Sequence, residues 1–200
     1  YEIASCLVGS EMCIRDSKTV GPRKVLINKG ARPEDKPIWI EGPHMYKING
    51  KYFLMAAEGG TAGWHSEVIF RGDSPMGKFI PWKNNPILTQ RHLDSERPNP
   101  VTCAGHADLI QSKEGDWWAF FLACRPINNK FENLGRETFA MPVKWSEDGF
   151  PYMTQGEDKI PMTLKRKAIQ RDSTVTFGNF EVNDEFDNAT LGLTWICLLY

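Results

Sequence analysis

The sequence predicts an all-β fold built from consecutive antiparallel strand pairs. Three observations predict this class. Aromatic residues, which favour strands, make up 12% of the 200 residues. The 17 Gly and 13 Pro supply many turns. No segment shows a convincing helical period, whereas short apolar runs bounded by turn residues recur along the chain.

Two hairpins and a third turn give the order of the expected strands. Asn49-Gly50 lies between two strand-like runs, and Asn-Gly is favoured in two-residue hairpin turns because both positions tolerate positive φ. The second turn is Lys113-Glu114-Gly115-Asp116, and the third is Glu147-Asp148-Gly149. The expected strands are, in order, 37–40, 45–48, 51–56, 109–112, 117–122 and 139–145.

The two hairpins repeat at an offset of 65 residues, which takes Gly50 to Gly115 and Tyr52 to Trp117. Repeated antiparallel units with an aromatic second strand are typical of β-propeller blades, whose innermost strands line a central channel. The same offset takes Glu41 to His106. The repeat therefore predicts that these two side chains meet in one central site.

Charge and hydropathy exclude two classes of partner. The 24 Lys+Arg and 25 Asp+Glu give a net charge of −1, so we expect no nucleic acid, which needs a basic surface. No apolar run approaches the roughly 18–20 residues of a membrane span, so we expect no membrane partner. The five Cys fit neither a disulfide framework nor a zinc spacing, and we interpret Cys103 and Cys124 as buried thiols.

Several motifs, in one order along the chain, resemble those of glycoside hydrolase family 43. They are Trp39-Ile40-Glu41-Gly42-Pro43-His44, Ala104-Gly105-His106-Ala107-Asp108, Gly115-Asp116-Trp117-Trp118 and Leu134-Gly135-Arg136-Glu137-Thr138. The resemblance covers about residues 37–161. It implies a partial five-bladed β-propeller, holding about the last two blades, followed by the start of a β-sandwich domain. It also implies inverting hydrolysis of terminal xylosyl or arabinofuranosyl residues, with xylan or arabinoxylan oligosaccharides as substrates.

The resemblance assigns the catalytic role to Glu41, as the general acid that protonates the leaving oxygen. This chemistry needs a carboxylic acid that is still protonated near neutral pH. The substrate-binding residues by resemblance are Arg136, Thr61 and His44. Arg136 would donate hydrogen bonds to sugar hydroxyls. In the alternative interpretation, Arg136 is a surface residue that pairs with Glu137. Thr61 either binds substrate or holds the strand that carries Glu41. His44 is expected to orient neighbouring residues rather than to act as a catalyst.

His106 is the expected central-channel residue, and no cofactor is required for the expected reaction. In many relatives the corresponding histidine faces a bound calcium or its water shell. Calcium prefers oxygen ligands, so a lone His is a poor calcium site by itself. Two readings therefore stay open for His106: a calcium neighbour through water, and a hydrogen-bonded channel histidine without metal.

We expect four segments along the chain. Residues 1–17 and 197–200 resemble translated sequencing-adapter sequence and are interpreted as non-native ends. Residues 18–165 are expected to form the partial propeller. Residues 166–196 are expected to hold a linker and the start of a lectin-like β-sandwich.

The family also uses an Asp base and a third Asp, which belong to blades upstream of Lys18. The chain is therefore expected to be inactive alone, and its longer parent to be secreted or periplasmic.

Two other function classes compete with the hydrolase. A carbohydrate-binding propeller without catalysis could use the same Arg, His and aromatic loop residues. Binding alone, however, does not need a carboxyl at the leaving-group position, so Glu41 favours the enzyme. In a purely structural repeat protein, the conjunction of Glu41, His106 and Arg136 would be a coincidence.

Overall fold

The computed structural model describes residues 24–128 and 130–165. The chain divides into two units, Tyr1–Leu164 and Lys165–Tyr200, and the strands described here belong to the first unit. The expected non-native ends, 1–17 and 197–200, and the expected second domain at 166–196 lie outside the described residues.

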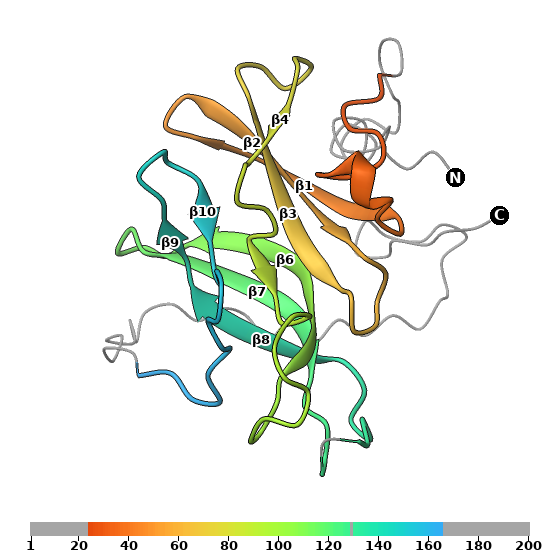
Figure 1. The fold of residues 1–200 in the computed structure, drawn as a ribbon. Coiled ribbons are helices and arrows are strands. Elements are labelled where there is room, and N and C mark those ends of the chain that lie inside the picture. The colour runs from red at the N-terminus through yellow and green to blue at the C-terminus, as the bar shows by residue number, and fades with distance from the viewer. Residues whose placement is uncertain (1–23, 129, 166–200) are drawn as a thin grey trace, which may run out of the picture. The chain divides into compact units, whose positions relative to one another are not determined.

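The described chain forms strands and one short 3₁₀ turn (Figure 1). In order, these are η1 (Pro33–Asp35), β1 (Ile40–Ile48), β2 (Lys51–Glu58), β3 (Ser66–Gly72), β4 (Ile80–Pro81), β5 (Leu88–Thr89), β6 (Thr102–Gln111), β7 (Trp117–Cys124), β8 (Glu137–Pro142), β9 (Lys144–Trp145) and β10 (Pro151–Tyr152). No α-helix occurs among these residues, which confirms the all-β class. Within the same ranges, no helix has the length and hydropathy needed to cross a membrane.

Three antiparallel sheets result. The first has the order β1-β2-β3-β4, with β5 also paired to β3; the second has the order β6-β7-β8; the third is the β9–β10 hairpin. Both main hairpin turns are confirmed. Asn49 and Gly50 have φ values of 49° and 75°, and Gly115 has a φ of 92°. These left-handed values explain why Asn and Gly stand at the turns.

Three strand predictions need correction. Residues 37–39 are not a strand, because Ile38 and Trp39 project into solvent and Trp39 has a φ of 35°, so β1 begins only at Ile40. The expected strand at 139–145 is split at Val143 between β8 and β9. The sequence analysis missed β3 altogether. Its apolar run, Val68-Ile69-Phe70, is only three residues long and follows the buried polar residues Ser66 and Glu67.

The repeat offset of 65 is wrong by one residue for the second strands. β2 begins at Lys51 and β7 at Trp117. The side chains facing the shared core are Phe53 and Met55 on β2, and Ala119 and Phe121 on β7. These pairs are 66 residues apart. Side chains alternate between the two faces of a strand. An error of one residue in the offset therefore matches core-facing residues of one strand with outward-facing residues of the other.

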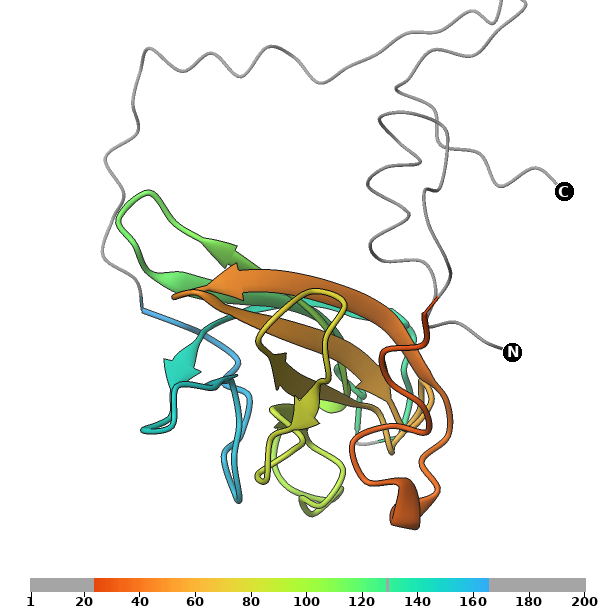
Figure 2. The ribbon, with the colours of Figure 1, turned by 90° about the horizontal axis from the view of Figure 1, so that it is seen from above.

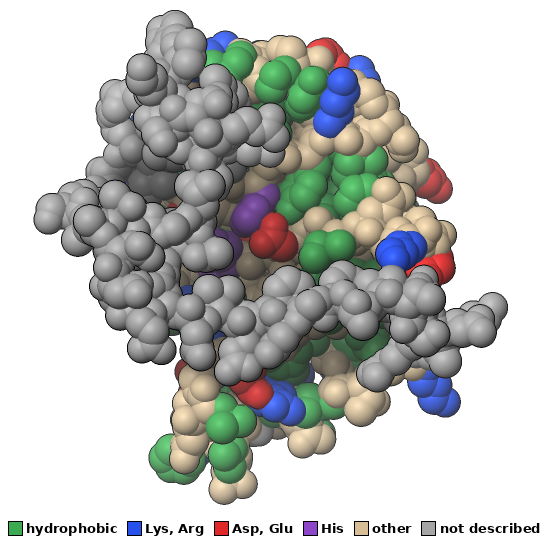
Figure 3. Space-filling view, turned by 180° about the vertical axis from the view of Figure 1, so that it is seen from behind, with side chains coloured by type: hydrophobic (Ala, Val, Ile, Leu, Met, Phe, Trp, Pro, Cys, Tyr) green, Lys and Arg blue, Asp and Glu red, His purple; other side chains and the backbone are tan. Residues whose placement is uncertain are grey.

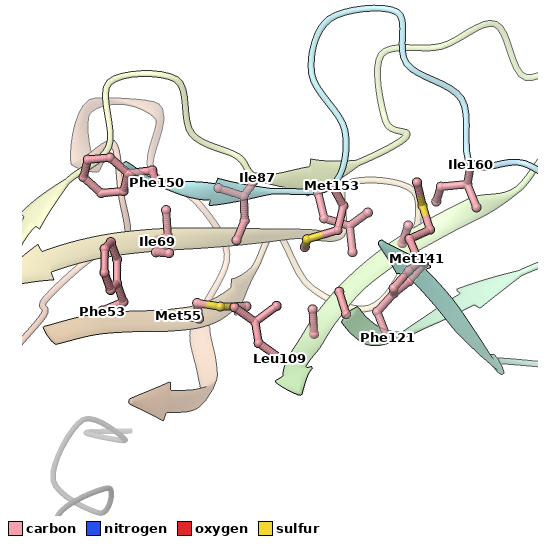
Figure 4. Close-up of a cluster of buried hydrophobic side chains, with 14 of the residues drawn as sticks. Phe53, Met55, Ile69, Ile87, Leu109, Phe121, Met141, Phe150, Met153 and Ile160 are labelled. Atoms are coloured by element: carbon pink, nitrogen blue, oxygen red, sulfur yellow. The ribbon is translucent and has the colours of Figure 1, made fainter. Parts of the chain in front are cut away.

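The main hydrophobic core lies between the first two sheets. Figure 4 shows Met55 and Ile69 of the first sheet facing the same cluster as Leu109 and Phe121 of the second. A smaller cluster covers the opposite face of the first sheet. It contains Ala31, Leu54, Val68, Phe70 and Phe79. Side chains of β1 and β6 also meet, since the ring centroids of His44 and His106 lie 6.4 Å apart. Figure 2 shows the same fold from above.

Candidate functional site

The start of β1 is irregular, and this irregularity makes room for His106. The pairing of β1 with β2 shifts register between Glu41 and His44. Gly42, between them, has a φ of 53°. A Cβ atom at residue 42 would lie 2.0 Å from the His106 Nε2 atom, so only glycine admits the imidazole here. The Glu-Gly-Pro sequence therefore places the backbone of Glu41 beside His106.

The other half of this contact comes from two bulges in β6. The pairing with β7 shifts register between Thr102 and Gly105 and again between Gly105 and Asp108. His106, in the second bulge, has a φ of 55°, which is uncommon for a residue with a side chain. Bulges re-aim side chains, and this one directs the His106 ring at Gly42 of β1.

A buried carboxylate on β3 holds the second bulge. Glu67 is fully buried, and its Oε2 atom accepts a hydrogen bond of 3.0 Å from the Ala107 backbone N–H. Its Oε1 atom has no hydrogen-bond partner among the described residues. Desolvation raises the pKa of Glu67 well above its ordinary value, against the opposing effect of the backbone donors of Ala107 and His106.

His65 brings the candidate residues into one electrostatic group. It is buried, and its Nδ1 atom lies 2.8 Å from the Cys103 carbonyl oxygen. A carbonyl can only accept, so Nδ1 carries the proton and Nε2 is the bare nitrogen of the neutral ring. Desolvation lowers the pKa of His65; His106 and Arg136 lower it further, and Glu41 opposes them. The charges of Glu41, His106 and Arg136 thus all act on His65.

His44 is held by Asp108, a residue of the neighbouring sheet. Its Nδ1 atom is 2.9 Å from Asp108 Oδ1. The Tyr46 hydroxyl donates to the same oxygen at 3.0 Å and accepts from the Leu109 N–H at 2.9 Å. Burial raises the pKa of Tyr46. The His44 ring centroid lies 6.4 Å from that of His106, which suits His44 to a positioning role.

Arg136 and Thr61 line one pocket of about 520 Å³ between the loop after β2 and the loop before β8. The alternative pairing of Arg136 with Glu137 is not found. Glu137 instead accepts two hydrogen bonds from Arg125, and the distance from Arg125 Nε to Glu137 Oε2 is 2.8 Å. Phe131 belongs to a loop that lines the pocket and is exposed. Figure 3 shows histidine and acidic side chains together on one face of the molecule, beside hydrophobic side chains.

Calcium near His106 is an expectation that depends on the oxygen ligands around this histidine. Calcium takes about six to eight oxygen ligands. Glu41 and Asp108 flank the contact between Gly42 and His106, and one oxygen of the buried Glu67 already accepts a hydrogen bond from the Ala107 N–H. In ranges 24–128 and 130–165, the cluster that could hold a metal consists instead of Cys103, Cys124 and Glu132.

Sequence reasoning singled out five residues of this region and missed two. Glu41, His44 and His106 lie where β1 meets β6, whereas Thr61 and Arg136 line the pocket. The missed residues are His65 and Glu67. The available signal was a pair of titratable residues immediately before the apolar run Val68-Ile69-Phe70. Their partners, Cys103 and Ala107, lie about 40 residues away, so no local pattern could connect them.

Comparison with known proteins gives one consistent family. The family model described as glycosyl hydrolases family 43 matches residues 2–151. A non-reducing end alpha-L-arabinofuranosidase of Bacteroides ovatus is 43% identical over 163 residues, which is 78% of this chain and 28% of the relative. A xylosidase/arabinosidase of Butyrivibrio fibrisolvens is 37% identical over 184 residues, covering 88% of this chain and 34% of the relative.

Solved structures agree with these sequence matches. The crystal structure of a GH43_12 protein retrieved from a capybara gut metagenome is 47% identical, with a TM-score of 0.59. The match covers 72% of this chain and 27% of that structure. The chain therefore spans about a third or less of the length of the relatives it matches.

Proposed function

The chain belongs to glycosyl hydrolase family 43, and on that premise we propose that it supplies the general-acid side of an inverting glycosidase site. The proposed substrates are terminal xylosyl or arabinofuranosyl residues of xylan or arabinoxylan oligosaccharides. Relatives named as an arabinofuranosidase and a xylosidase/arabinosidase support this substrate class. The observation that carries the proposal is the contact of Gly42, the residue after Glu41, with the His106 ring at the junction of β1 and β6.

Glu41 is proposed to protonate the departing glycosidic oxygen. In an inverting mechanism a second carboxylate, about 6.5–9.5 Å away, activates water on the opposite face of the sugar. The resemblance places that base, and a third Asp, in blades before Lys18. The chain spans 28% of its Bacteroides ovatus relative, which supports the proposal that it does not turn over substrate by itself.

The other candidate residues take binding and positioning roles in this proposal. Arg136 and Thr61 share a pocket with room for a sugar ring, and a guanidinium offers fixed donors for hydroxyl groups. His44 is fixed by Asp108 and in turn borders His106. Calcium near His106 stays a prediction, and no step of the proposed reaction depends on it.

The test of the acid role is Glu41→Gln in an active protein that carries the complete catalytic domain. Glutamine keeps the shape of the side chain but cannot donate the proton. General acid catalysis contributes about 10²–10⁴-fold, so cleavage of natural oligosaccharides should fall by that factor. Aryl glycosides with acidic leaving groups need little protonation and should lose far less. Steady-state rates on both substrates check this.

Glu147→Gln is the matched control, since Glu147 is an exposed residue of the β9–β10 turn. It should leave both rates unchanged. Equal losses on natural and aryl substrates for Glu41→Gln would contradict the acid role. Turnover of an aryl xyloside by the purified 200-residue chain would contradict the proposed need for a second carboxylate from outside it. Sugar binding with no turnover by any longer form would favour the carbohydrate-binding alternative.

A further inference from the structure

Two cysteines and one carboxylate converge in the wall of the pocket that Arg136 lines. Cys103 and Cys124 are buried free thiols, as expected from the sequence, and Glu132 is exposed on the neighbouring loop. The two sulfur atoms and a Glu132 carboxylate oxygen all lie within 4.8 Å of one another. The distance from Cys103 Sγ to Glu132 Oε1 is 3.8 Å. All three residues line the pocket.

This convergence depends on the first bulge of β6. Thr102 pairs with Cys124, so the side chains of these two residues share a face of the sheet. Regular alternation would send the next side chain, Cys103, to the opposite face. The register shift after Thr102 and the φ of 54° at Cys103 remove this alternation. The bulge thereby brings the second thiol to the pocket side.

We propose that Cys103, Cys124 and Glu132 bind a thiophilic divalent cation of the Zn²⁺ class, with the fourth coordination position open to the pocket. Thiolate and carboxylate ligands in tetrahedral sets are typical of Zn²⁺. Zn–S bonds of about 2.3 Å require sulfur atoms about 3.8 Å apart. The three ligand atoms lie within 4.8 Å of one another, so small side-chain movements complete the site.

The surroundings of the three ligands suit such a site. The Thr102 hydroxyl donates to Glu132 Oε1 at 3.3 Å and so orients the carboxylate. Two thiolates and one carboxylate carry three negative charges, one more than a divalent cation neutralises. Lys130 and Arg136 line the same pocket and can balance that excess charge. None of the three ligands has a role in the proposed hydrolysis, so metal binding can be tested separately from that reaction.

The test uses the full chain with Cys6, Cys13 and Cys197 replaced by Ser, so that only the two pocket thiols remain. After reduction, the protein is titrated with Cd²⁺ under argon. We expect a thiolate-to-cadmium charge-transfer absorption that saturates at one Cd²⁺ per chain. Zn²⁺ should compete with this signal. Co²⁺ should give the visible bands of a tetrahedral thiolate site.

Variants of each ligand decide between this site and simpler explanations. Cys124→Ser should abolish saturation at one equivalent. Glu132→Gln, at an exposed position, should keep the charge-transfer band but weaken affinity by at least roughly tenfold. Glu147→Gln is the control and should not change the titration, and circular dichroism checks that each variant is folded.

Three outcomes would overturn the proposal. The first is no saturable band in the folded chain. The second is a band that survives Cys124→Ser unchanged. The third is mass-spectrometric detection of a Cys103–Cys124 disulfide that forms equally fast with and without Zn²⁺.

Discussion

Strands β3 and β7 each pair with neighbours on both edges, but their two faces have different surroundings. Residues 66–70 of β3 are buried without interruption, because the main core covers one face of this strand and the smaller cluster covers the other. In β7 the core covers Ala119 and Phe121, whereas Phe120, between them, is 39% exposed. The cover over β3 includes Ala31 and Phe79, which lie outside both hairpins. Burial of a strand therefore depends on distant segments as much as on its own pattern.

The largest expected effect tests this difference directly. Phe70 points into the smaller cluster, whereas Phe120 is on the uncovered face of β7. Phe70→Ala should lower the free energy of unfolding by about 3–5 kcal/mol, since it empties a buried site. Phe120→Ala should cost less than about 1 kcal/mol, as is usual for exposed positions.

Urea denaturation of the purified chain and both variants measures these values, and an unchanged m-value is the control for two-state behaviour. Equal losses would mean that the outer face of β7 is covered in solution, and the contrast between the two strands would fail.

A side chain completes the outer edge of β3, and its removal is the second test. β5 pairs with Ser66 and Glu67, and β4 pairs with Phe70 and Arg71. Between these two pairings, the buried Asn85 accepts from the Ile69 N–H and donates to the Ile69 carbonyl, both at 2.8 Å.

Asn85→Ala should cost about 1–3 kcal/mol, because it leaves the buried Ile69 N–H unpaired, whereas the Ile69 carbonyl keeps the Trp82 backbone N–H as a donor. Hydrogen exchange should quicken at the Ile69 amide more than at the Ala119 amide of β7. Equal protection at Ile69 in both proteins would show that water replaces the side-chain oxygen as the acceptor for the Ile69 N–H.

The same contrast explains which features the sequence could predict. Hairpin turns and strand alternation are local, so Asn49-Gly50 and the turn at Gly115 were predicted correctly. β3 was missed because both of its faces are buried and because its buried charged residue, Glu67, has its partner in β6. Glu67 reaches the Ala107 N–H, 40 residues away. The cluster of Cys103, Cys124 and Glu132 has no motif spacing, because a bulge and a loop assemble it.

The third prediction concerns Glu67, which links the two sheets. Burial raises its pKa in the folded state above the ordinary value of 4.5. Its contribution to stability is therefore fully present below that ordinary pKa and is lost as the pH rises through the raised value. Glutamine accepts from the same N–H and has no proton to lose. The stability of Glu67→Gln relative to the natural chain should thus increase with pH.

Denaturation at about pH 5 and about pH 8 measures this trend. Glu67→Leu is the companion variant, and it should lose about 1–3 kcal/mol at the lower pH because the Ala107 N–H is left unpaired. If the difference between the natural chain and Glu67→Gln does not change with pH, Glu67 does not titrate across this range. The link between the sheets would then be a simple hydrogen bond.

The smallest expected effect concerns the hairpin turns at Gly50 and Gly115, in which the two sheets are alike. Gly50 and Gly115 both have left-handed φ values, and a Cβ atom at either position would meet no atom within 4 Å. Replacement by Ala therefore adds backbone strain alone, of about 1–2 kcal/mol. Because the two turns lie in different sheets, the losses in Gly50→Ala and Gly115→Ala should be similar and should add in the double variant. A much smaller loss at Gly115 would mean that the longer turn of 112–116 relaxes around the new side chain. The two hairpins would then differ in their turns as well as in their cover.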